Sequence, residues 1–163
     1  MALSTTALEI SIPTPADGER LLGLARGVRL FTAADVETIH ELWDEFIIKG
    51  EDSWYSFIIA QRSGKLHGFA CYGRRALTDG TWDLYWLGVD QSSQGQGIGK
   101  TMLRKVKESV RQRGGRLLII ETAGKPEFEP TRQFYLHSGC TLEARVRDFY
   151  ARGDDLFIFT VRV

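Results

Sequence analysis

Alternating glycines mark residues 94–99, which read Gln-Gly-Gln-Gly-Ile-Gly. An apolar run over residues 84–89 precedes them, and a helical pattern over residues 100–113 follows. The backbone amides at the start of a helix point outward, and the helix dipole favours negative charge there. Glycine lets the backbone approach an anion closely, because it has no side chain. The sequence therefore predicts a phosphate-binding loop.

Two nucleotide-binding patterns fit this loop only in part. The residues Gly99-Lys100-Thr101 match the end of a P-loop, G-x-x-x-x-G-K-[ST], but Gln94 replaces its first glycine. The glycines are spaced G-x-G-x-G, whereas a dinucleotide fingerprint requires G-x-G-x-x-G. Glu121 is a weak substitute for the acidic residue that binds ribose in that fold.

A third pattern, [QR]-x-x-G-x-[GA], fits at every position through Gln94, Gly97 and Gly99. It is the acetyl-CoA signature of the GNAT superfamily of N-acetyltransferases. Downstream, residues 131–140 resemble the LYxxxGF element of the same family. The resemblance runs over residues 28–163. The alternative is a glycine loop that merely links a strand to a helix.

This resemblance implies that acetyl-CoA is the cofactor, without a metal. The loop amides would hold the diphosphate of coenzyme A, and the end of the preceding strand would pair with its pantetheine arm. A glycine at position 88 suits the close approach of a ligand backbone. The implied cofactor-binding residues are Leu87, Gly88, Val89, Gln94, Gly95, Gln96, Gly97, Ile98, Gly99 and Lys100.

Acetyl transfer from a thioester to an amine requires a proton acceptor for the amine, donors for the oxyanion and a proton for the thiolate. The resemblance implies Tyr135 as the acid, with packing as its alternative role, and the amide near Val89 as the oxyanion donor. Asp83, in an aromatic-rich strand, is the first candidate for the base, although it could instead hydrogen-bond locally. Glu121 is the second candidate, and many relatives use water chains.

The acceptor is expected to contact the helix after Thr32, the loop that follows it and the final hairpin, where acidic and aromatic residues gather. Carboxylates and aromatic rings stabilise a cationic amine. Residues 148–155 are the best candidate for an acceptor wall, although aspartates there could instead bond their own backbone. The predicted substrate-binding residues are Trp54, Tyr55, Asp148 and Tyr150.

Strands and helices in alternation must position these residues. Their order predicts an α/β fold, a central, mostly antiparallel mixed sheet with helices on both faces. The resemblance adds that strands 4 and 5 splay apart, with the cofactor between them. Residues 1–27 are expected to form an arm, irregular except for a short strand around residues 8–12, and residues 28–163 the acetyltransferase domain. The expected strands lie at 28–31, 54–61, 66–74, 81–89, 117–121, 140–146 and 156–163, the last two joined by a long connection, and the expected helices at 33–49, 100–113 and 131–137.

The composition is that of an ordinary globular chain. Its 163 residues suggest one domain, and 21 basic against 21 acidic residues give no general affinity for nucleic acid or an anionic membrane. Two cysteines are too few for a disulfide framework, and no secretion signal or membrane span is recognised. A cytoplasmic protein is expected, and the three histidines have no metal-ligand spacing.

The sequence thus predicts an N-acetyltransferase that moves acetyl from acetyl-CoA to a primary amine of a small molecule or peptide, by direct attack in a ternary complex. A homodimer is compatible with this prediction. Two alternatives stay open, namely a GNAT-like protein that binds or senses acyl-CoA without transfer, and a P-loop nucleotide-binding protein.

Overall fold

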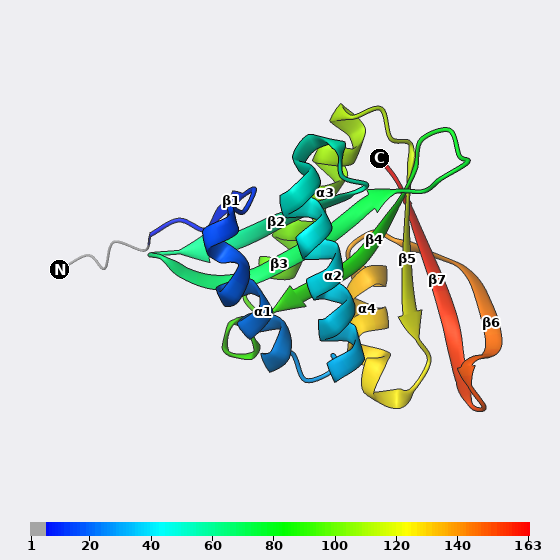
Figure 1. The fold of residues 1–163 in the computed structure, drawn as a ribbon. Helices are drawn as coiled ribbons and strands as arrows, with labels where there is room; N and C mark the ends of the chain where they lie inside the picture. Colours follow the sequence, from blue (N-terminus) through cyan, green and yellow to red (C-terminus); the bar gives the residue numbers. More distant parts are fainter. Residues whose placement is uncertain (1–5) are drawn as a thin grey trace. The chain divides into compact units, whose positions relative to one another are not determined.

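The fold, taken from a computed structural model that describes residues 6–163, is built on a seven-stranded sheet (Figure 1). The strands, in the spatial order β1-β2-β3-β4-β5-β7-β6, are β1 (Glu9–Ser11), β2 (Tyr55–Arg62), β3 (Lys65–Arg74), β4 (Thr81–Val89), β5 (Leu117–Ala123), β6 (Thr141–Ala151) and β7 (Asp154–Arg162). The helices are α1 (Gly18–Gly27), α2 (Ala33–Lys49), α3 (Ile98–Gln112) and α4 (Glu129–His137), with short 3₁₀ helices η1 (Pro15–Asp17), η2 (Gly50–Asp52), η3 (Gln91–Ser93) and η4 (Pro126–Phe128).

The strand directions confirm the predicted mixed α/β class. β4 and β5 are parallel, whereas β1 with β2, β5 with β7, and β6 with β7 are antiparallel. The pairing of β4 with β5 ends at Leu84 and Ile120, while β5 continues beside β7 to Ala123. The parallel register thus covers only the first four residues of each of these two strands, and their splaying stays a prediction. The chain forms two compact units, one up to Tyr72 with residues 86–106, and one of residues 73–85 with 107–163.

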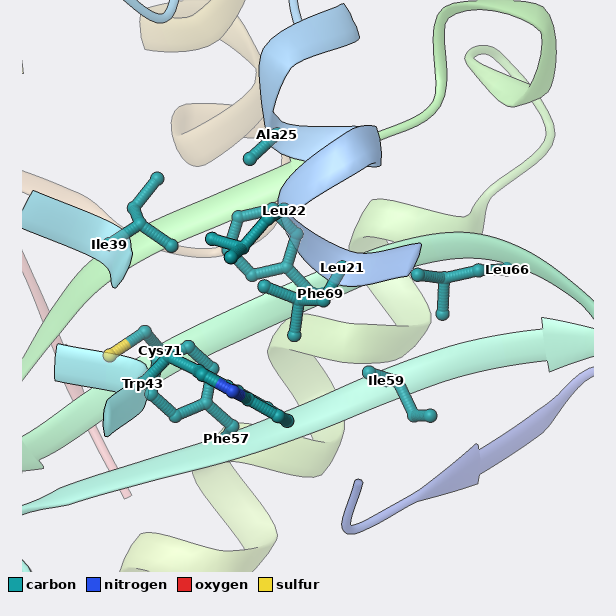
Figure 2. Close-up of a cluster of buried hydrophobic side chains, with 10 residues drawn as sticks. All are labelled: Leu21, Leu22, Ala25, Ile39, Trp43, Phe57, Ile59, Leu66, Phe69 and Cys71. Carbon is teal, nitrogen blue, oxygen red and sulfur yellow. The ribbon is translucent and has the colours of Figure 1, made fainter. Parts of the chain in front are cut away.

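The core of the first unit lies between α1, α2 and the strands β2 and β3, and Figure 1 shows both helices crossing these strands. The Thr32 side chain accepts a hydrogen bond from the Asp35 amide, and the Asp35 carboxylate accepts one from the Thr32 amide, so these two residues cap the start of α2. Trp43 packs edge-to-face on Phe57, with ring centroids 5.3 Å apart. The buried cluster of Figure 2 consists of Leu21, Leu22, Ala25, Ile39, Trp43, Phe57, Ile59, Leu66, Phe69 and Cys71.

Helices cover both faces of the sheet in this unit. Successive residues of a strand point to opposite faces, and Phe69 belongs to the cluster under α1 and α2. At the neighbouring Gly68, an added Cβ would lie only 2.9 Å from Met102 Sδ of α3. The helix α3 therefore packs on the face opposite to α1 and α2.

In the second unit, β4, β5, β7 and β6 follow one another in the sheet. Trp82, Leu118 and Phe159 are almost fully buried on its inner face. The ring of Tyr135, from α4, packs against Phe159 with centroids 5.7 Å apart. Every residue of the edge strand β6 is exposed, so the core of this unit lies under β5 and β7.

The segment before α2 differs from the prediction. The short strand near residues 8–12 is confirmed as β1, but α1 forms where an irregular arm was expected. The glycines of α1 lower its helix propensity and conceal it in the sequence. Burial of Leu21, Leu22 and Ala25 outweighs this cost, because each is at most 3% exposed.

The glycine at the start of α1 also has a packing role. A Cβ at Gly18 would lie 2.9 Å from Trp43 Nε1, so only glycine lets α1 approach α2 this closely. The predicted strand at residues 28–31 is wrong, since these residues turn the chain between two helices and the Phe31 amide donates to Val28 O at 3.0 Å. The division into an arm at 1–27 and a domain at 28–163 stays a prediction.

The final hairpin is tighter than predicted. β6 and β7 pair up to Ala151 and Asp154, leaving a short turn in place of a long connection. The strand continues because an irregularity at Asp148, with a φ angle of 53°, restores the pairing, and Gly153 takes the left-handed turn position with a φ of 78°. Among residues 6–163, no helix has both the length and the apolar composition needed to cross a membrane.

Candidate active site

The predicted phosphate-binding loop joins β4 to α3 through η3. Gly95 and Gly97 have φ angles of 75° and 78°, which favour glycine, and an added Cβ at either would meet nothing within 4 Å. The Thr101 amide donates to Gly97 O at 3.0 Å, and the amides of residues 98–100 lie ahead of this bond. A strand, an open glycine loop and a helix N-terminus thus follow one another as predicted.

The longer side chains of the loop stabilise the loop itself. Ile98 is 2% exposed and fixes the start of α3 in the core. Gln94 Nε2 donates to Val89 O at 3.3 Å, and Gln96 Nε2 donates to Ser92 O at 3.4 Å. Main-chain amides, rather than these side chains, are therefore the groups that the loop presents to an anion.

Gly88, near the end of β4, is required by packing inside the first unit. A Cβ there would lie 2.7 Å from Phe69 Cε1 and 3.3 Å from Phe31 Cε2. These distances leave no room for a side chain, because real Cβ atoms do not approach carbon so closely. The ring of Phe69 thus accounts for this glycine, and its role in ligand approach stays a prediction, as do the roles of Leu87 and Val89.

An arginine that the sequence reasoning missed brings the two candidate bases together. Asp83 is 7% exposed, and its Oδ1 accepts a hydrogen bond of 2.5 Å from Arg75 Nη2. The same Nη2 lies 3.8 Å from Glu121 Oε1. The hydrogen bond to Asp83 is the main cause of a raised pKa for the Arg75 guanidinium, and Glu121 adds to it. Asp83 therefore makes the local contact that was its alternative role.

Tyr135, the predicted acid, is a buried residue. It is 6% exposed, and burial raises the pKa of its phenol, to which nearby Cys140 adds. Its ring contacts Phe134 as well as Phe159, with centroids 5.2 Å and 5.7 Å away. The phenol keeps its proton at neutral pH, as an acid must, and the ring also has the packing role weighed as the alternative.

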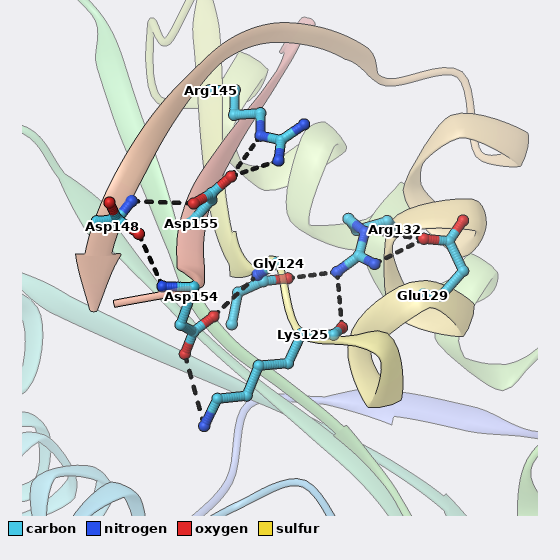
Figure 3. A network of polar contacts seen from close by, with 10 residues as sticks. Gly124, Lys125, Glu129, Arg132, Arg145, Asp148, Asp154 and Asp155 are labelled. Atoms are coloured by element: carbon cyan, nitrogen blue, oxygen red, sulfur yellow. Dashed lines mark hydrogen bonds and ion pairs between the residues drawn. The ribbon is translucent and has the colours of Figure 1, made fainter. Parts of the chain in front are cut away.

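The turn between β6 and β7 is held by its own aspartates (Figure 3). Asp148 Oδ1 accepts a hydrogen bond of 2.7 Å from the Gly153 amide. Asp155 accepts hydrogen bonds from the Asp148 amide at 2.9 Å and from Arg145 Nε at 2.5 Å, and both lower the pKa of its carboxyl. This is the structured turn weighed against an acceptor wall. Tyr150, in the same strand, is 48% exposed.

A second group of contacts in Figure 3 fixes the loop after β5. Arg132 of α4 is 8% exposed and donates to Ala123 O at 2.6 Å and to Lys125 O at 3.1 Å. Asp154 of β7 accepts a hydrogen bond from the Gly124 amide at 3.2 Å. Hydrogen bonds with α4 and β7 therefore fix this loop, and the sequence analysis did not predict these contacts.

An aromatic ring links the two groups of contacts. The guanidinium carbons of Arg132 and Arg145 lie 5.0 Å and 5.1 Å from the centre of the Phe157 ring. Both arginines are thus in cation–π distance of one side chain of β7. No pattern in the sequence indicates this cluster, because its members come from α4, β6 and β7.

Of the predicted acceptor residues in the first unit, Trp54 is exposed and Tyr55 is partly buried. Trp54 is 53% exposed, and burial, with Glu45 nearby, raises the pKa of the Tyr55 phenol. A cavity of about 430 Å³ in this unit has other walls. It is lined by Leu22, Arg26, Phe31, Thr32, Ala33, Val36, Glu37 and His40.

The chain is similar to known proteins over most of its length. The model of the acetyltransferase (GNAT) family matches residues 20–139. A GNAT-family protein from Desulfovibrio desulfuricans superposes with a TM-score of 0.92 at 35% identity, over 96% of this chain and 99% of that chain. The ribosomal-protein-S18-alanine N-acetyltransferase of Escherichia coli gives a TM-score of 0.77 at 19% identity, over 96% and 94% of the two chains. A Salmonella typhimurium protein crystallised with acetyl-CoA gives 0.74 at 19% identity, over 96% and 94%. A comparison with proteins of curated function gives no match. The chain therefore belongs to the acetyltransferase (GNAT) family.

Proposed function

We propose that this protein transfers the acetyl group of acetyl-CoA to a primary amine of a small molecule or a peptide, by direct attack in a ternary complex. Membership of the family makes acetyl-CoA the donor and sets the P-loop nucleotide alternative aside. The observation that carries the proposal is the open glycine loop at the start of α3, with left-handed φ angles at Gly95 and Gly97. Such a loop binds an anion through main-chain amides alone.

The amides of residues 94–100 would hold the diphosphate of coenzyme A. The 15-residue helix α3 directs its N-terminal dipole at this place, which favours negative charge. The main chain of Leu87, Gly88 and Val89, at the end of β4, would pair with the pantetheine arm. This pairing is assigned from the family, and the register of β4 with β5, which ends at Leu84 and Ile120, is compatible with it.

The reaction forms a C–N bond and breaks the C–S bond of the thioester. The amine nitrogen attacks the carbonyl carbon, and the Val89 amide stabilises the oxyanion. A carboxylate takes the proton that the amine loses, and Tyr135 gives a proton to the leaving thiolate. Binding both reactants together supplies much of the rate enhancement in such a mechanism.

Glu121 suits the role of proton acceptor better than Asp83. The Glu121 side chain is 45% exposed and 3.8 Å from Arg75, whereas that of Asp83 is 10% exposed and 2.5 Å from it. Asp83 would have to leave a direct ion pair before it could accept a proton. We therefore place Glu121 first and Asp83 second.

The acceptor would be a cationic amine that meets aromatic rings. Exposure of Trp54 and Tyr150 supports this, because both rings are about half accessible at 53% and 48%. Tyr55 and Asp148 are weaker candidates. The Asp148 carboxylate already accepts a hydrogen bond from the Gly153 amide. Amine acceptors also fit the fold's neighbours, among them enzymes named for ribosomal-protein alanine and for aminoglycosides.

Two measurements test the proposal. Isothermal titration should show binding of acetyl-CoA and none of ATP. A panel of amines should then include acceptors that release free thiol from acetyl-CoA, one thiol for each acetylated amine. Binding without thiol release across the panel would favour the acyl-CoA-binding alternative, and failure to bind acetyl-CoA would reject the proposal.

A further inference from the structure

One partly buried contact joins β3 to the entrance of the glycine loop. His67 Nδ1, on β3, and Ser93 Oγ, at the end of η3, are hydrogen-bonded at 2.7 Å. Ser93 is only 2% exposed and His67 is partly buried, so water reaches the contact from the His67 side only. The main chain adds a second link, because the Asp90 amide donates to His67 O at 2.8 Å. A single residue of β3 thus holds both ends of η3.

The short helix η3 transmits this support to the loop. Asp90 accepts hydrogen bonds from the amide and the hydroxyl of Ser92, and the Ser93 amide donates to Asp90 O at 2.8 Å. Lys65, also on β3, reaches Ser92 Oγ at 3.5 Å. Because these bonds make η3 rigid, the position of Ser93 sets where Gln94 and the glycines begin.

Beyond Ser93, only a few exposed contacts stabilise the loop between its two ends. Gly95 and Gly97 have open space where a side chain would be, with nothing within 4 Å of an added Cβ. The bonds of Gln94 and Gln96 are made by exposed side chains at 3.3 Å and 3.4 Å. The loop is therefore fixed chiefly at its ends, by Ser93 before it and by α3 after it.

The support under this contact cannot shift easily. At Gly68, the residue after His67, an added Cβ would lie 2.9 Å from both Gly88 O and Met102 Sδ. The strand β3 is thus in close contact with β4 and with α3, the two elements that flank the loop. A hydrogen bond from such a strand places the loop accurately.

We infer that His67 is a positioning residue, which acts through Ser93 to hold the loop amides in the arrangement that binds the diphosphate of coenzyme A. The inference rests on the proposed function, since it takes this loop as the diphosphate site. Ordering the loop in advance removes an entropy cost that binding would otherwise bear. The contact involves no reacting atom, so it governs affinity for coenzyme A and not the chemical step.

Three substitutions test this role. Ser93→Ala and His67→Leu remove the contact from either side, and His67→Asn keeps a side chain that can hydrogen-bond to Ser93. We expect the first two to weaken coenzyme A binding roughly 5- to 10-fold in isothermal titration, which corresponds to the loss of one partly buried hydrogen bond. His67→Asn should lie nearer to the wild type. The variant with both Ser93→Ala and His67→Leu should bind no more weakly than the weaker single variant, because both act on one contact.

Kinetics separate positioning from a general loss of structure. At saturating acetyl-CoA, kcat should stay within about twofold of the wild type while the KM for acetyl-CoA rises. His40→Leu is the matched control, since His40 lies at the surface near Asp44, 3.6 Å away, and this variant should change neither constant. In the cofactor-free protein, hydrogen exchange of amides 94–100 should be faster in Ser93→Ala and His67→Leu than in the wild type.

Unchanged affinity in both contact-deleting variants would overturn the inference, as would a fall in kcat at unchanged affinity. Unchanged exchange of the loop amides would also overturn it, and that measurement needs no enzymatic activity. If the wild type itself does not bind coenzyme A, the proposed function fails and the inference fails with it. Binding by the wild type with no response in the variants rejects the inference alone.

Discussion

The glycine loop of the first unit and the β6–β7 turn of the second are both predicted to bind ligand, yet they are built in opposite ways. In the loop, Gly95 and Gly97 have nothing within 4 Å of an added Cβ, and the main-chain amides are presented. In the turn, the carboxylates of Asp148 and Asp155 already accept hydrogen bonds from the turn itself. Polar side chains that stabilise a turn are less available to a ligand, so the exposed ring of Tyr150 is the better candidate to meet an acceptor.

The largest expected effect is the loss of stability when Arg132, whose side chain stabilises the second unit, is replaced. Arg132→Ala leaves two carbonyl oxygens, of Ala123 and Lys125, without their buried donor and removes a cation from the Phe157 ring. We expect the free energy of unfolding to fall by about 3 kcal/mol, measured by urea denaturation.

Arg145→Ala is the matched control, because this arginine lies near the same ring of Phe157 but its side chain is 59% exposed. Its loss should be much smaller, since ion pairs open to water contribute little. Equal losses in the two variants would mean that the buried contacts of Arg132 are not what holds the loop after β5.

The two candidate bases differ in the same way. Asp83 is paired directly with Arg75, whereas Glu121 is more exposed and lies farther from it. Glu121→Gln should lower kcat/KM for the amine about 100-fold, the usual contribution of a general base. Asp83→Asn should act mainly on stability, because Asp83 is the direct partner of Arg75 at 2.5 Å. Steady-state kinetics at several pH values, with urea denaturation of both variants, check this. A larger loss of activity in Asp83→Asn would reverse the order we propose.

A smaller effect is expected in the loop, and it should fall on binding. Gly97→Ala places a side chain at a φ of 78°, which costs about 1–2 kcal/mol for an L-residue. The loop should relax into another conformation, so the KM for acetyl-CoA is expected to rise roughly 10-fold. Gly64→Ala meets the same strain in the β2–β3 turn, with a φ of 76° and equally open space. Gly64→Ala should lower the free energy of unfolding and leave the KM for acetyl-CoA unchanged. A higher KM in both variants would mean that the effect of Gly97→Ala comes from a general loss of folding and not from the loop.

Much of the fold could be predicted because local patterns carry it. The Thr32–Asp35 cap marks the start of α2, and the glycine loop marks the passage from β4 to α3. The helix α1 was missed because its stability comes from burial of Leu21 and Leu22 against α2, while its glycines give a poor local signal. Tertiary packing here outweighs propensity.

The candidate site shows the same difference between features set by local sequence and features set by tertiary contacts. A backbone site can be predicted from a contiguous motif, since the glycines at 95 and 97 need no distant partner. The ion pair of Arg75 with Asp83 joins residues on either side of a turn, and the contacts of Arg132 join α4 to the end of β5. Such contacts depend on register and helix placement, which one sequence does not specify.

The smallest expected effect is a pH dependence of stability that comes from His67. The contact of this side chain with Ser93 is partly buried and lies next to the open loop. Burial is the main cause of a lowered pKa for His67, Lys65 and Arg62 lower it further, and Asp90 opposes them. The unfolded chain, with a histidine pKa of about 6.5, then binds more protons than the folded chain as the pH falls through this range. Stability contributed by neutral His67 is therefore present above about pH 6.5 and is lost below it.

We expect the urea midpoint of the wild type to fall more between pH 7.5 and 5.5 than that of His67→Leu, which has no such group. This window lies above the range in which aspartates with lowered pKa, such as Asp90 and Asp155, take up protons. Saturating coenzyme A should steepen the contrast if the loop it orders also fixes Ser93 against a neutral imidazole. Equal pH slopes in the two proteins would contradict this prediction, because they would show that the folded state does not lower the pKa of His67 enough to affect stability.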